Sequence, residues 1–535
     1  MKRNQLFSFY TTIRNPERYL EFLEIIKKFD NLICDEKVLV DIAKELISYG
    51  IYKPTKRSEE IKEKTRRREK LSSLEVEEVM KENPQTRYGG WAKRTKSHLK
   101  PLLELAFIKD EDNKITVLNN GIMLGNLNND AEINDFWTKL LLKVNFSNPF
   151  RKSENKSNPF LLTLLVINSV NKEWKKVKRK ATGISKAEFG YYVLSAKNND
   201  YSSITEQIIS HRKKFGISNN FKQKSFIQHL SQLAKVKEDE IKTETVKDYV
   251  DNVIRHFRLT GLISYRGGAR FIDLSKIFDE EIKQIIEKNE PKWKEFSLGE
   301  YVGHLLEDKV KIEWKKDKIE KEPLIMKFVE ENEINLTKVK EELLVLCSSS
   351  YKKNKRKLFS LKEVNIEDSL KLEFLVAIAF ILILKRVKEV KIVPNLLIDD
   401  EGIPRCHAPG GKGDIEINYK NEFNLLVEVT LRRDKFGQES EVTSITRHEK
   451  ELWSETNLTT YTAFVAPSIH LDIIKYLKWH LFKEDHQFDY HVFPISTKKF
   501  IEYFMDVNKE FEMTVKEKFS EFKSNKTDDL PSIVN

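Results

Sequence analysis

Apolar residues recur every three or four positions through the N-terminal half of the chain, with polar residues between them. This spacing predicts helices within residues 1–50, over 93–106 and over 246–259. Short alternating segments follow the last two helices, and they predict β-hairpins over residues 107–118 and 262–272. The same order of elements, a helix and then a hairpin, is therefore expected twice.

A helix followed by a two-stranded hairpin is the order found in a winged helix-turn-helix. In that motif a helix enters the major groove of DNA, and the hairpin lies along the backbone. Two such units, at about residues 1–125 and 200–275, predict a protein that reads duplex DNA. The alternative is that both are ordinary helix–hairpin packing modules without a nucleic-acid partner.

The C-terminal third has the pattern of an α/β domain. Residues 374–384 form the most apolar segment, too short for a membrane span, and predict a buried helix or strand. The remaining elements are predicted as two strands joined by a turn, at 414–417 and 423–431, then a helix from about Glu439, a strand at 461–467, a helix at 469–481 and a strand at 490–495. This order predicts a mixed central sheet.

These patterns together predict a multidomain α+β protein. Residues 1–275 are expected to form a mostly helical, winged-helix-type DNA-recognition region. Residues 276–360 are highly charged and predict a helical linker. Residues 361–520 are expected to form the α/β domain, and residues 521–535 a flexible tail.

The charge of the chain favours a polyanionic partner. Lys and Arg total 94 against 83 acidic residues, so the net charge is +11 and the pI is about 9.0. Basic residues gather in three runs, within 51–100 (at 66–70 and 87–100), at 172–180 and at 352–357. Several such runs favour contact with nucleic-acid phosphates, although each alone could be a solvated helix face.

Targeting and redox features predict an intracellular protein. No apolar run approaches the roughly 18 residues of a membrane span, and the N-terminus lacks an apolar signal core. The three cysteines, Cys34, Cys347 and Cys406, form neither a disulfide framework nor a paired metal-binding spacing. We therefore expect a reducing compartment and no membrane partner.

Two acidic residues, Asp414 and Glu428, stand on the neighbouring strands of the predicted C-terminal hairpin. Glu428 lies between Leu426, Val427 and Val429, where a bare carboxylate would be costly to bury. A divalent cation offsets that cost, and two carboxylates with a carbonyl suit Mg²⁺. The alternative is an acidic pair neutralised by the arginines that follow the second strand.

Other candidate side chains lie on the helices next to this hairpin. Glu441 and His448 are seven residues apart and share one helix face, from which they could meet the metal or an attacking water. Arg447 could hold a phosphate oxygen. Glu373 lies within the most apolar helix and would need a partner if it is buried. An ordinary polar helix face, or exposure at a helix edge, is the alternative for each.

These motifs resemble a PD-(D/E)XK nuclease core and, more narrowly, the AlwI-like family of type IIS restriction and nicking endonucleases. The resemblance rests on GGKGDIEINY, LLVEVTLR and EVTSITRH, and on the N-terminal FYTTIRNPERYLEFLEII. It covers the whole chain in outline. It implies metal-dependent cleavage or nicking of duplex DNA at a fixed distance from a short asymmetric site.

By motif position, the resemblance makes Asp414 and Glu428 metal ligands, and adds Glu441, His448 and Glu373 to the catalytic set, with Mg²⁺ as cofactor. It implies a prokaryotic cytoplasmic enzyme of a restriction–modification system, with a cognate DNA methyltransferase as genetic partner. Because one nuclease site cuts one strand, double-strand cleavage would need a transient homodimer or a separate second catalytic subunit. The alternative function is a non-cleaving, sequence-specific DNA-binding protein with a degenerate nuclease domain.

The candidates for DNA contact are basic residues of the two predicted winged units. They are Arg87, Lys93, Arg94, Lys96, Arg255 and Arg258.

The sequence departs from the broad nuclease pattern at two positions. Gly413 stands where a proline usually precedes the aspartate. Thr430 stands where the catalytic lysine is usual, which leaves open which group activates the water.

Overall fold

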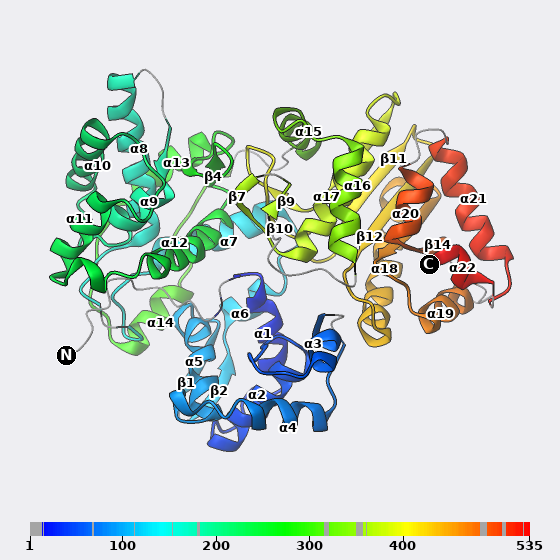
Figure 1. The fold of residues 1–535 in the computed structure, drawn as a ribbon, viewed down its shortest axis with the longest axis horizontal. Coiled ribbons are helices and arrows are strands. Elements are labelled where there is room, and N and C mark those ends of the chain that lie inside the picture. The colour runs from blue at the N-terminus through cyan, green and yellow to red at the C-terminus, as the bar shows by residue number, and fades with distance from the viewer. Residues whose placement is uncertain are drawn as a thin grey trace. The chain divides into compact units, whose positions relative to one another are not determined.

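The computed structural model of the chain falls into two compact units, of residues 1–45 with 84–318 and of residues 46–83 with 319–535 (Figure 1). The structure describes residues 13, 15–66, 69–111, 113–151, 153–178, 182–314, 320–348, 357–359, 361–481, 489–505, 510–527 and 529–535. The predicted basic run at 352–357 therefore lies almost wholly outside the described residues.

The first unit is mostly helical. Its helices include α1 (Arg18–Lys27), α2 (Glu36–Ser48, which ends just beyond the unit boundary), α5 (Trp91–Glu104), α6 (Asn119–Leu124), α7 (Asp130–Lys143), α8 (Pro159–Lys178), α9 (Lys186–Glu188), α10 (Tyr201–Phe215), α11 (Lys224–Ala234), α12 (Thr243–Arg258), α13 (Asp279–Lys288) and α14 (Leu298–Leu306). Its strands include β1 (Ile108–Glu111), β2 (Lys114–Val117), β3 (Ile184–Ser185), β4 (Ile263–Arg266) and β5 (Phe271–Leu274).

Both predicted hairpins are present, each after its predicted helix. α5 is followed by the antiparallel pair β1–β2, in which Ile108 lies opposite Val117. α12 is followed by β4–β5, in which Ile263 lies opposite Leu274. The second hairpin gains a third strand, because β3 from far upstream pairs with β5. That long-range pairing has no local signal in the sequence.

The second unit contains the α/β domain. Its helices include α3 (Glu59–Arg66), α4 (Ser73–Glu82), α15 (Lys321–Glu331), α16 (Leu336–Cys347), α17 (Asp368–Leu384), α18 (Lys435–Thr456), α19 (Leu471–Leu481), α20 (Thr497–Phe504), α21 (Phe511–Ser524) and α22 (Leu530–Val534). Its strands include β6 (Lys357–Leu358), β7 (Leu361–Asn365), β8 (Val390–Pro394), β9 (Leu397–Ile398), β10 (Pro404–Cys406), β11 (Ile415–Tyr419), β12 (Phe423–Val429), β13 (Thr460–Ala466) and β14 (Val492–Ser496).

The predicted mixed sheet is confirmed, with five strands in the order β14-β13-β12-β11-β8. β11 pairs antiparallel with both β12 and β8, whereas β12, β13 and β14 run parallel. The parallel strands are joined by α18 and α19, as parallel neighbours require crossover connections. Because helices cover it, the central strand β12 is buried along almost its whole length.

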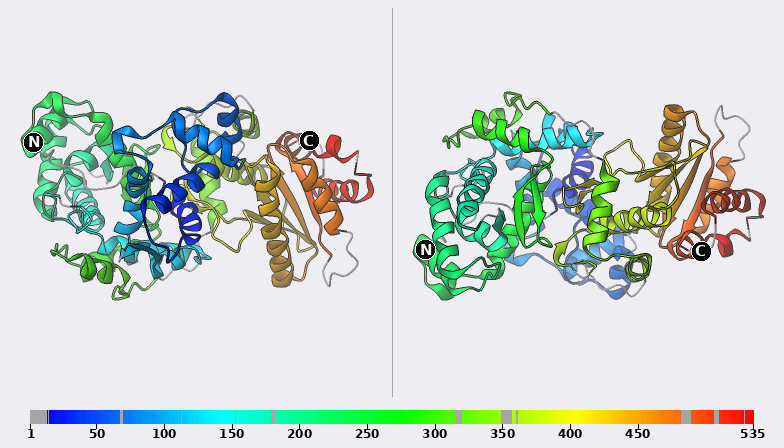
Figure 2. Two further views of the ribbon diagram at one scale, coloured as in Figure 1. Left: turned by 90° about the horizontal axis from the view of Figure 1, so that it is seen from below. Right: turned by 90° about the horizontal axis from the view of Figure 1, so that it is seen from above.

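Helices pack on both faces of this sheet (Figure 2). On one face, the Asn424 amide of β12 donates to the Thr456 hydroxyl of α18 over 2.7 Å. On the other face, Tyr419 of β11 contacts Phe511 of α21, whose ring also lies against Phe380 of α17. α17 is buried along most of its length, as its apolar composition predicts.

The predicted linker and tail both contain packed helices. Of the linker range 276–360, α13 and α14 belong to the first unit, and α15 and α16 to the second. The range 521–535 holds the end of α21 and all of α22, in which Leu530 and Val534 are buried. This burial differs from the flexible tail predicted from the sequence. Among the described residues, none of the helices has both the length and the apolar character of a membrane span.

Candidate active site

Asp414 and Glu428 lie opposite each other at one end of the β11–β12 hairpin. Ile415 pairs with Val427, so the next pair outward joins these two acidic residues. Because side chains alternate along a strand, Glu416 points to the same face as Asp414. The sheet therefore presents three carboxylates on one face, which is also the face of α18.

The Asp414 carboxylate is held by the backbone of the neighbouring strand. The Val429 N–H donates to its Oδ2 over 2.7 Å. Burial raises the pKa of Asp414 well above its usual range, and the negative charges of Glu373 and Glu428 raise it further. Asp414 is therefore surrounded by other carboxylates, and a bound cation would offset the repulsion among their negative charges.

Glu428 is paired with a histidine of α18. His448 Nδ1 lies 2.8 Å from Glu428 Oε1, and His448 Nε2 lies 3.1 Å from Arg447 Nη2. An arginine can only donate, so Nε2 is the acceptor and Nδ1 carries the proton. Burial, and next the charge of Arg447, lower the pKa of His448, which favours this neutral tautomer. Burial raises the pKa of Glu428, followed by the charge of Glu441.

A second carboxylate–histidine pair joins α17 to the segment after β10. His407 Nδ1 lies 2.7 Å from Glu373 Oε2, and its Nε2 lies 3.1 Å from the Ser369 hydroxyl. The other carboxylate oxygen of Glu373, Oε1, is buried and has no hydrogen-bond partner among the described residues. A buried, orphaned carboxylate oxygen is costly unless something binds it. Its charge acts on both Asp414 and Glu428.

The remaining predicted residue, Glu441, and two residues that were not predicted, Glu416 and Asn395, lie at the edge of this cluster. Glu441 is partly exposed and pairs with Arg432, with 3.3 Å between Oε1 and Nε. Glu416 accepts a hydrogen bond from the Asn395 amide over 2.8 Å. The same amide donates to the Gly413 carbonyl over 2.7 Å, so Asn395 ties the strand to the turn before it.

The two departures from the nuclease pattern lie beside Glu428. A Cβ at Gly413 would stand 2.8 Å from Glu428 Oε1 and 2.3 Å from a methyl group of Leu426, so a side chain does not fit there unless both move. Thr430 lies two residues after Glu428, and its hydroxyl accepts from the Arg432 N–H over 3.2 Å. It offers no amine to a reacting water.

The cluster can supply two carboxylates to a metal, but not a preformed cage. In the described part of the chain, no three His, Cys, Asp or Glu side chains converge on one ion position. Mg²⁺ is typically held by one or two carboxylates, several waters and substrate phosphates. The like-charge crowding at Asp414 and the orphaned Glu373 oxygen fit such a cation.

The predicted DNA contacts belong to the first unit and differ in exposure. Arg87, Lys93 and Lys96 are exposed, at or near the start of α5, and Arg94 is half-buried. In α12, Arg255 is also half-buried. Arg258, by contrast, is buried, with its guanidinium carbon 4.1 Å from the centre of the Tyr265 ring. Its place against the hairpin indicates a packing role.

Sequence reasoning missed three members of the site, His407, Glu416 and Asn395. The histidine directly precedes the glycine-rich turn, and Glu416 alternates with Asp414 on β11. Strand alternation could therefore have indicated Glu416. Nothing local indicates that His407 meets Glu373, because 34 residues separate them.

Comparison with models of protein families gives a match that covers most of the chain. The model of the AlwI restriction endonuclease family matches twice, over residues 103–322 and 300–503. Comparison with the curated proteins gives no match.

Two solved structures are similar to this chain at low sequence identity. The small subunit (R.BspD6I2) of the heterodimeric restriction endonuclease R.BspD6I is 23% identical with a TM-score of 0.27, over 32% of this chain and 88% of that one. The BpuJ1 endonuclease binding domain, in complex with pyrene- and phenanthrene-modified DNA, is 14% identical with a TM-score of 0.32, over 51% and 81%. At these TM-scores neither likeness carries an argument.

Proposed function

The chain belongs to the AlwI restriction endonuclease family, and from this premise we propose that it is a type IIS enzyme that cuts duplex DNA with Mg²⁺. In this proposal, cleavage falls at a fixed distance from a short asymmetric site. Each chain carries one nuclease site and cuts one strand. Cleavage of both strands then needs a second copy or a separate catalytic subunit.

The observation that carries the proposal is the crowding of carboxylates at the end of the β11–β12 hairpin. Asp414 and Glu428 face each other across the strands, and burial raises the pKa of both, as do neighbouring carboxylates that include Glu373. A structural ion pair would place a basic partner at Asp414, but its hydrogen bond comes from a backbone N–H. A hard divalent cation is the natural counterion for such a set.

Asp414 and Glu428 would hold the Mg²⁺, which when bound polarises the scissile phosphate and lowers the pKa of a bound water. His448 fixes the orientation of the Glu428 carboxylate through its Nδ1–H. Arg447 is half-exposed beside it and can donate to a phosphate oxygen. Glu441, at the cluster edge, is the residue we assign to orienting the attacking water, because Thr430 cannot accept a proton at neutral pH.

In the first unit, the two helix–hairpin segments would act as winged-helix readers of the site. The exposed residues Lys93 and Lys96 lie in the first turns of α5, where a recognition helix contacts base edges and phosphates, and Arg87 lies in the short turn before it. Arg255 would contribute from α12. Arg258 is excluded from this role by its burial.

The test is incubation of supercoiled plasmid with the full chain and Mg²⁺, with an EDTA control. We expect discrete fragments or nicked circles with Mg²⁺ and intact plasmid with EDTA. Asp414→Asn should abolish cleavage while site-specific DNA binding is retained, because the carboxamide keeps the Val429 hydrogen bond but loses the charge. Cleavage by this variant at the normal rate would refute the metal assignment.

A non-cleaving DNA-binding protein is the second candidate, and the observation in its favour is Thr430. Its hydroxyl is already engaged by the Arg432 N–H, and it replaces the amine expected of an active nuclease. Specific binding by the wild-type chain without scission in Mg²⁺ would favour this candidate.

A further inference from the structure

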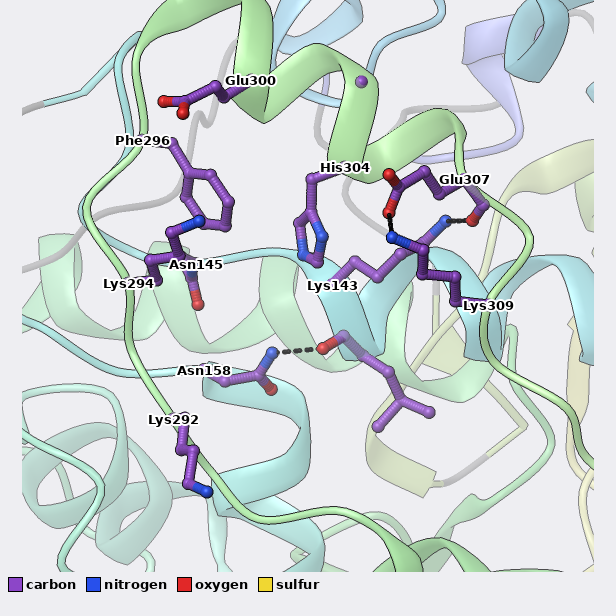
Figure 3. A pocket seen from close by; sticks show the side chains of 12 residues that line it. Lys143, Asn145, Asn158, Lys292, Lys294, Phe296, Glu300, His304, Glu307 and Lys309 are labelled. Carbon is purple, nitrogen blue, oxygen red and sulfur yellow. Dashed lines mark hydrogen bonds and ion pairs between the residues drawn. The ribbon is translucent and has the colours of Figure 1, made fainter.

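A cavity of about 530 Å³ lies in the first unit, whereas the carboxylate cluster belongs to the second (Figure 3). One face of α14 forms a wall, and the end of α7 and the extended chain at 292–296 form the others. Its volume falls in the range of small-molecule sites. Such sites are typically lined by apolar groups with a few precisely placed polar groups. The cavity shares no residue with the candidate active site.

Asn145 supplies a polar group inside the cavity without a protein partner. Its residue surface is only 4% exposed, and its side-chain amide lines the cavity. Among the described residues no side-chain hydrogen bond involves this amide, whereas the neighbouring Asn158 amide donates to two backbone carbonyls. A carboxamide that faces a cavity offers two N–H donors and a carbonyl acceptor, and is complementary to a ligand edge that both accepts and donates.

Two aromatic rings line the same cavity. Phe296 and His304 stack with ring centres 4.9 Å apart and an interplanar angle of 22°. Tyr301, which is fully buried, lies against Phe296 with ring centres 5.7 Å apart and an interplanar angle of 58°. Flat rings of this kind provide stacking surface for a planar group.

The charge around the cavity is positive. Lys143, Lys292, Lys294 and Lys309 line it, against Glu300 and Glu307, and Lys292 pairs with Glu290 over 2.5 Å. The Lys143 ammonium is fixed, because it donates to the carbonyls of Leu305 and Glu307 over 2.6 and 2.7 Å. Glu307 pairs with Lys309 and Glu300 with the Ser297 cap, both at exposed positions. Lys294 Nζ lies over the Phe296 ring, 5.1 Å from its centre, so a cation already covers part of this ring.

A stacked pair of rings, an amide without a side-chain partner and a lysine-rich lining match one class of ligand. We propose that this cavity binds a nucleotide, with an unpaired base against Phe296 and His304, its edge on the Asn145 amide, and its phosphate on the lysines. The nucleotide is either free or part of a DNA strand. The proposal does not depend on the nuclease proposal, because the two sites have no residue in common.

The test is equilibrium dialysis of the full-length protein with radiolabelled dAMP, whose base edge suits an asparagine amide. Deoxyribose 5-phosphate and inorganic phosphate are the comparison ligands, because they have the charge without the base. We expect dAMP to bind at least about tenfold more tightly than either, a difference of about 1.4 kcal/mol. Equal affinities, or no retained dAMP at about 10 mM, would overturn the proposal.

Two glycines of α14 provide a matched pair of variants. Gly303 lines the cavity, Gly299 lies one helical turn earlier outside it, and a Cβ at either meets no atom within 4 Å. Gly303→Leu should fill the cavity and weaken dAMP binding by about tenfold or more, whereas Gly299→Leu should leave it unchanged. Both remove a helical glycine, so both are expected to fold. Equal binding by the two variants would contradict the assignment.

Competition distinguishes the two sources of the nucleotide. Displacement of labelled dAMP by a short single-stranded oligodeoxyadenylate, or by a duplex with one unpaired adenine, would assign the site to a DNA strand. Displacement by dAMP but by neither DNA would assign it to a free nucleotide. Either result supports a nucleotide site, provided that Gly303→Leu has removed the binding.

Discussion

His448 donates its Nδ1 proton to Glu428 Oε1 over 2.8 Å and accepts from Arg447 through Nε2. The imidazole therefore spans the gap between a candidate metal ligand and a candidate phosphate ligand. Both ring nitrogens are occupied, so the residue fits an orienting role better than that of a free base.

His448→Phe should lower cleavage by roughly 10- to 100-fold, the usual cost of losing an outer partner of a metal ligand. It should also raise the Mg²⁺ concentration needed for half-maximal cleavage, because the Glu428 carboxylate loses its orientation. Initial cleavage rates across a Mg²⁺ titration provide the measurement. His470→Phe, on a histidine outside the cluster, is the control. An unchanged Mg²⁺ dependence in His448→Phe would show that His448 does not orient the Glu428 carboxylate.

Mg²⁺ should raise the melting temperature of the wild-type chain even without DNA. An ion that binds only the folded state stabilises it, by about 1.4 kcal/mol at roughly ten times its Kd. In a unit of this size that corresponds to a shift of about 2–4 °C. Asp414→Asn should lose the shift, which differential scanning fluorimetry can measure. An equal shift in wild type and variant would place the ion elsewhere.

Gly413→Ala should impair cleavage more than it impairs folding. The new Cβ would stand 2.8 Å from Glu428 Oε1 and would displace that carboxylate from its place opposite Asp414. We expect a loss of about tenfold or more in cleavage rate, since small misplacements of reacting groups are costly. Gly299→Ala, in an open position, should have no effect on rate. Full activity in Gly413→Ala would show that Glu428 need not stay where it is.

Glu449→Gln should change how stability depends on pH. Burial raises the pKa of Glu449 to about 8, although the His491 N–H and the Thr462 hydroxyl donate to its carboxylate. Between about pH 4.5 and 8 the folded state binds more protons than the unfolded state, so wild-type stability falls as pH rises through this window. At about 1.4 kcal/mol per pKa unit, the total is on the order of a few kcal/mol.

The glutamine in Glu449→Gln is neutral across this pH range. The stability of the variant should therefore not show the fall with rising pH that Glu449 causes in the wild type. Urea unfolding at several pH values from 5 to about 9 measures the difference between the two proteins. Parallel curves for wild type and variant would mean that Glu449 does not carry the pH dependence.

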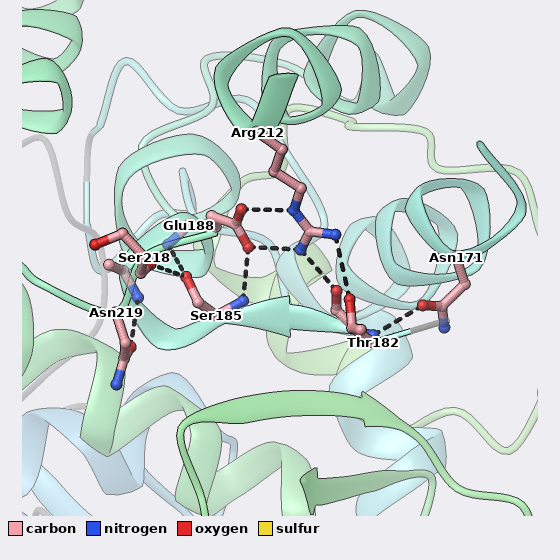
Figure 4. A network of polar contacts seen from close by, with 9 residues as sticks. Asn171, Thr182, Ser185, Glu188, Arg212, Ser218 and Asn219 are labelled. Carbon is pink, nitrogen blue, oxygen red and sulfur yellow. Dashed lines mark hydrogen bonds and ion pairs between the residues drawn. The ribbon is translucent and has the colours of Figure 1, made fainter. Parts of the chain in front are cut away.

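The buried pair of Glu188 and Arg212 should hold the first unit together (Figure 4). Arg212 donates from Nε and Nη2 to the two carboxylate oxygens over 2.7 Å each, and both side chains are fully buried. The same Nη2 donates to the Gly183 carbonyl over 2.7 Å, which secures the entry to β3. Glu188→Gln would leave a buried charge unpaired and should cost roughly 3–5 kcal/mol.

A double variant, Glu188→Leu with Arg212→Met, should lose less stability than Glu188→Gln, because no buried charge is left without a partner. Chemical denaturation of the three proteins provides the comparison. A double variant that is less stable than the single one would show that the network's hydrogen bonds, rather than charge pairing, dominate.

Local periodicity by itself determined much of the second unit. Alternation along residues 414–417 and 423–431 predicts the hairpin, and its register places Asp414 opposite Glu428 on one face. The apolar run at 374–384 predicts the buried part of α17. These features follow from the sequence because strand and helix periods fix which side chains share a face.

Only the tertiary structure decided which distant groups meet. Glu373 finds His407, β3 joins β5, and Arg258 packs on Tyr265 instead of facing outward. Each contact depends on how whole elements pack, and no spacing of nearby residues encodes that choice. The local sequence pattern thus accounts for Asp414 and Glu428 in the hairpin. The packing of α17 and α18 against the sheet brings Glu373 and His448 to them.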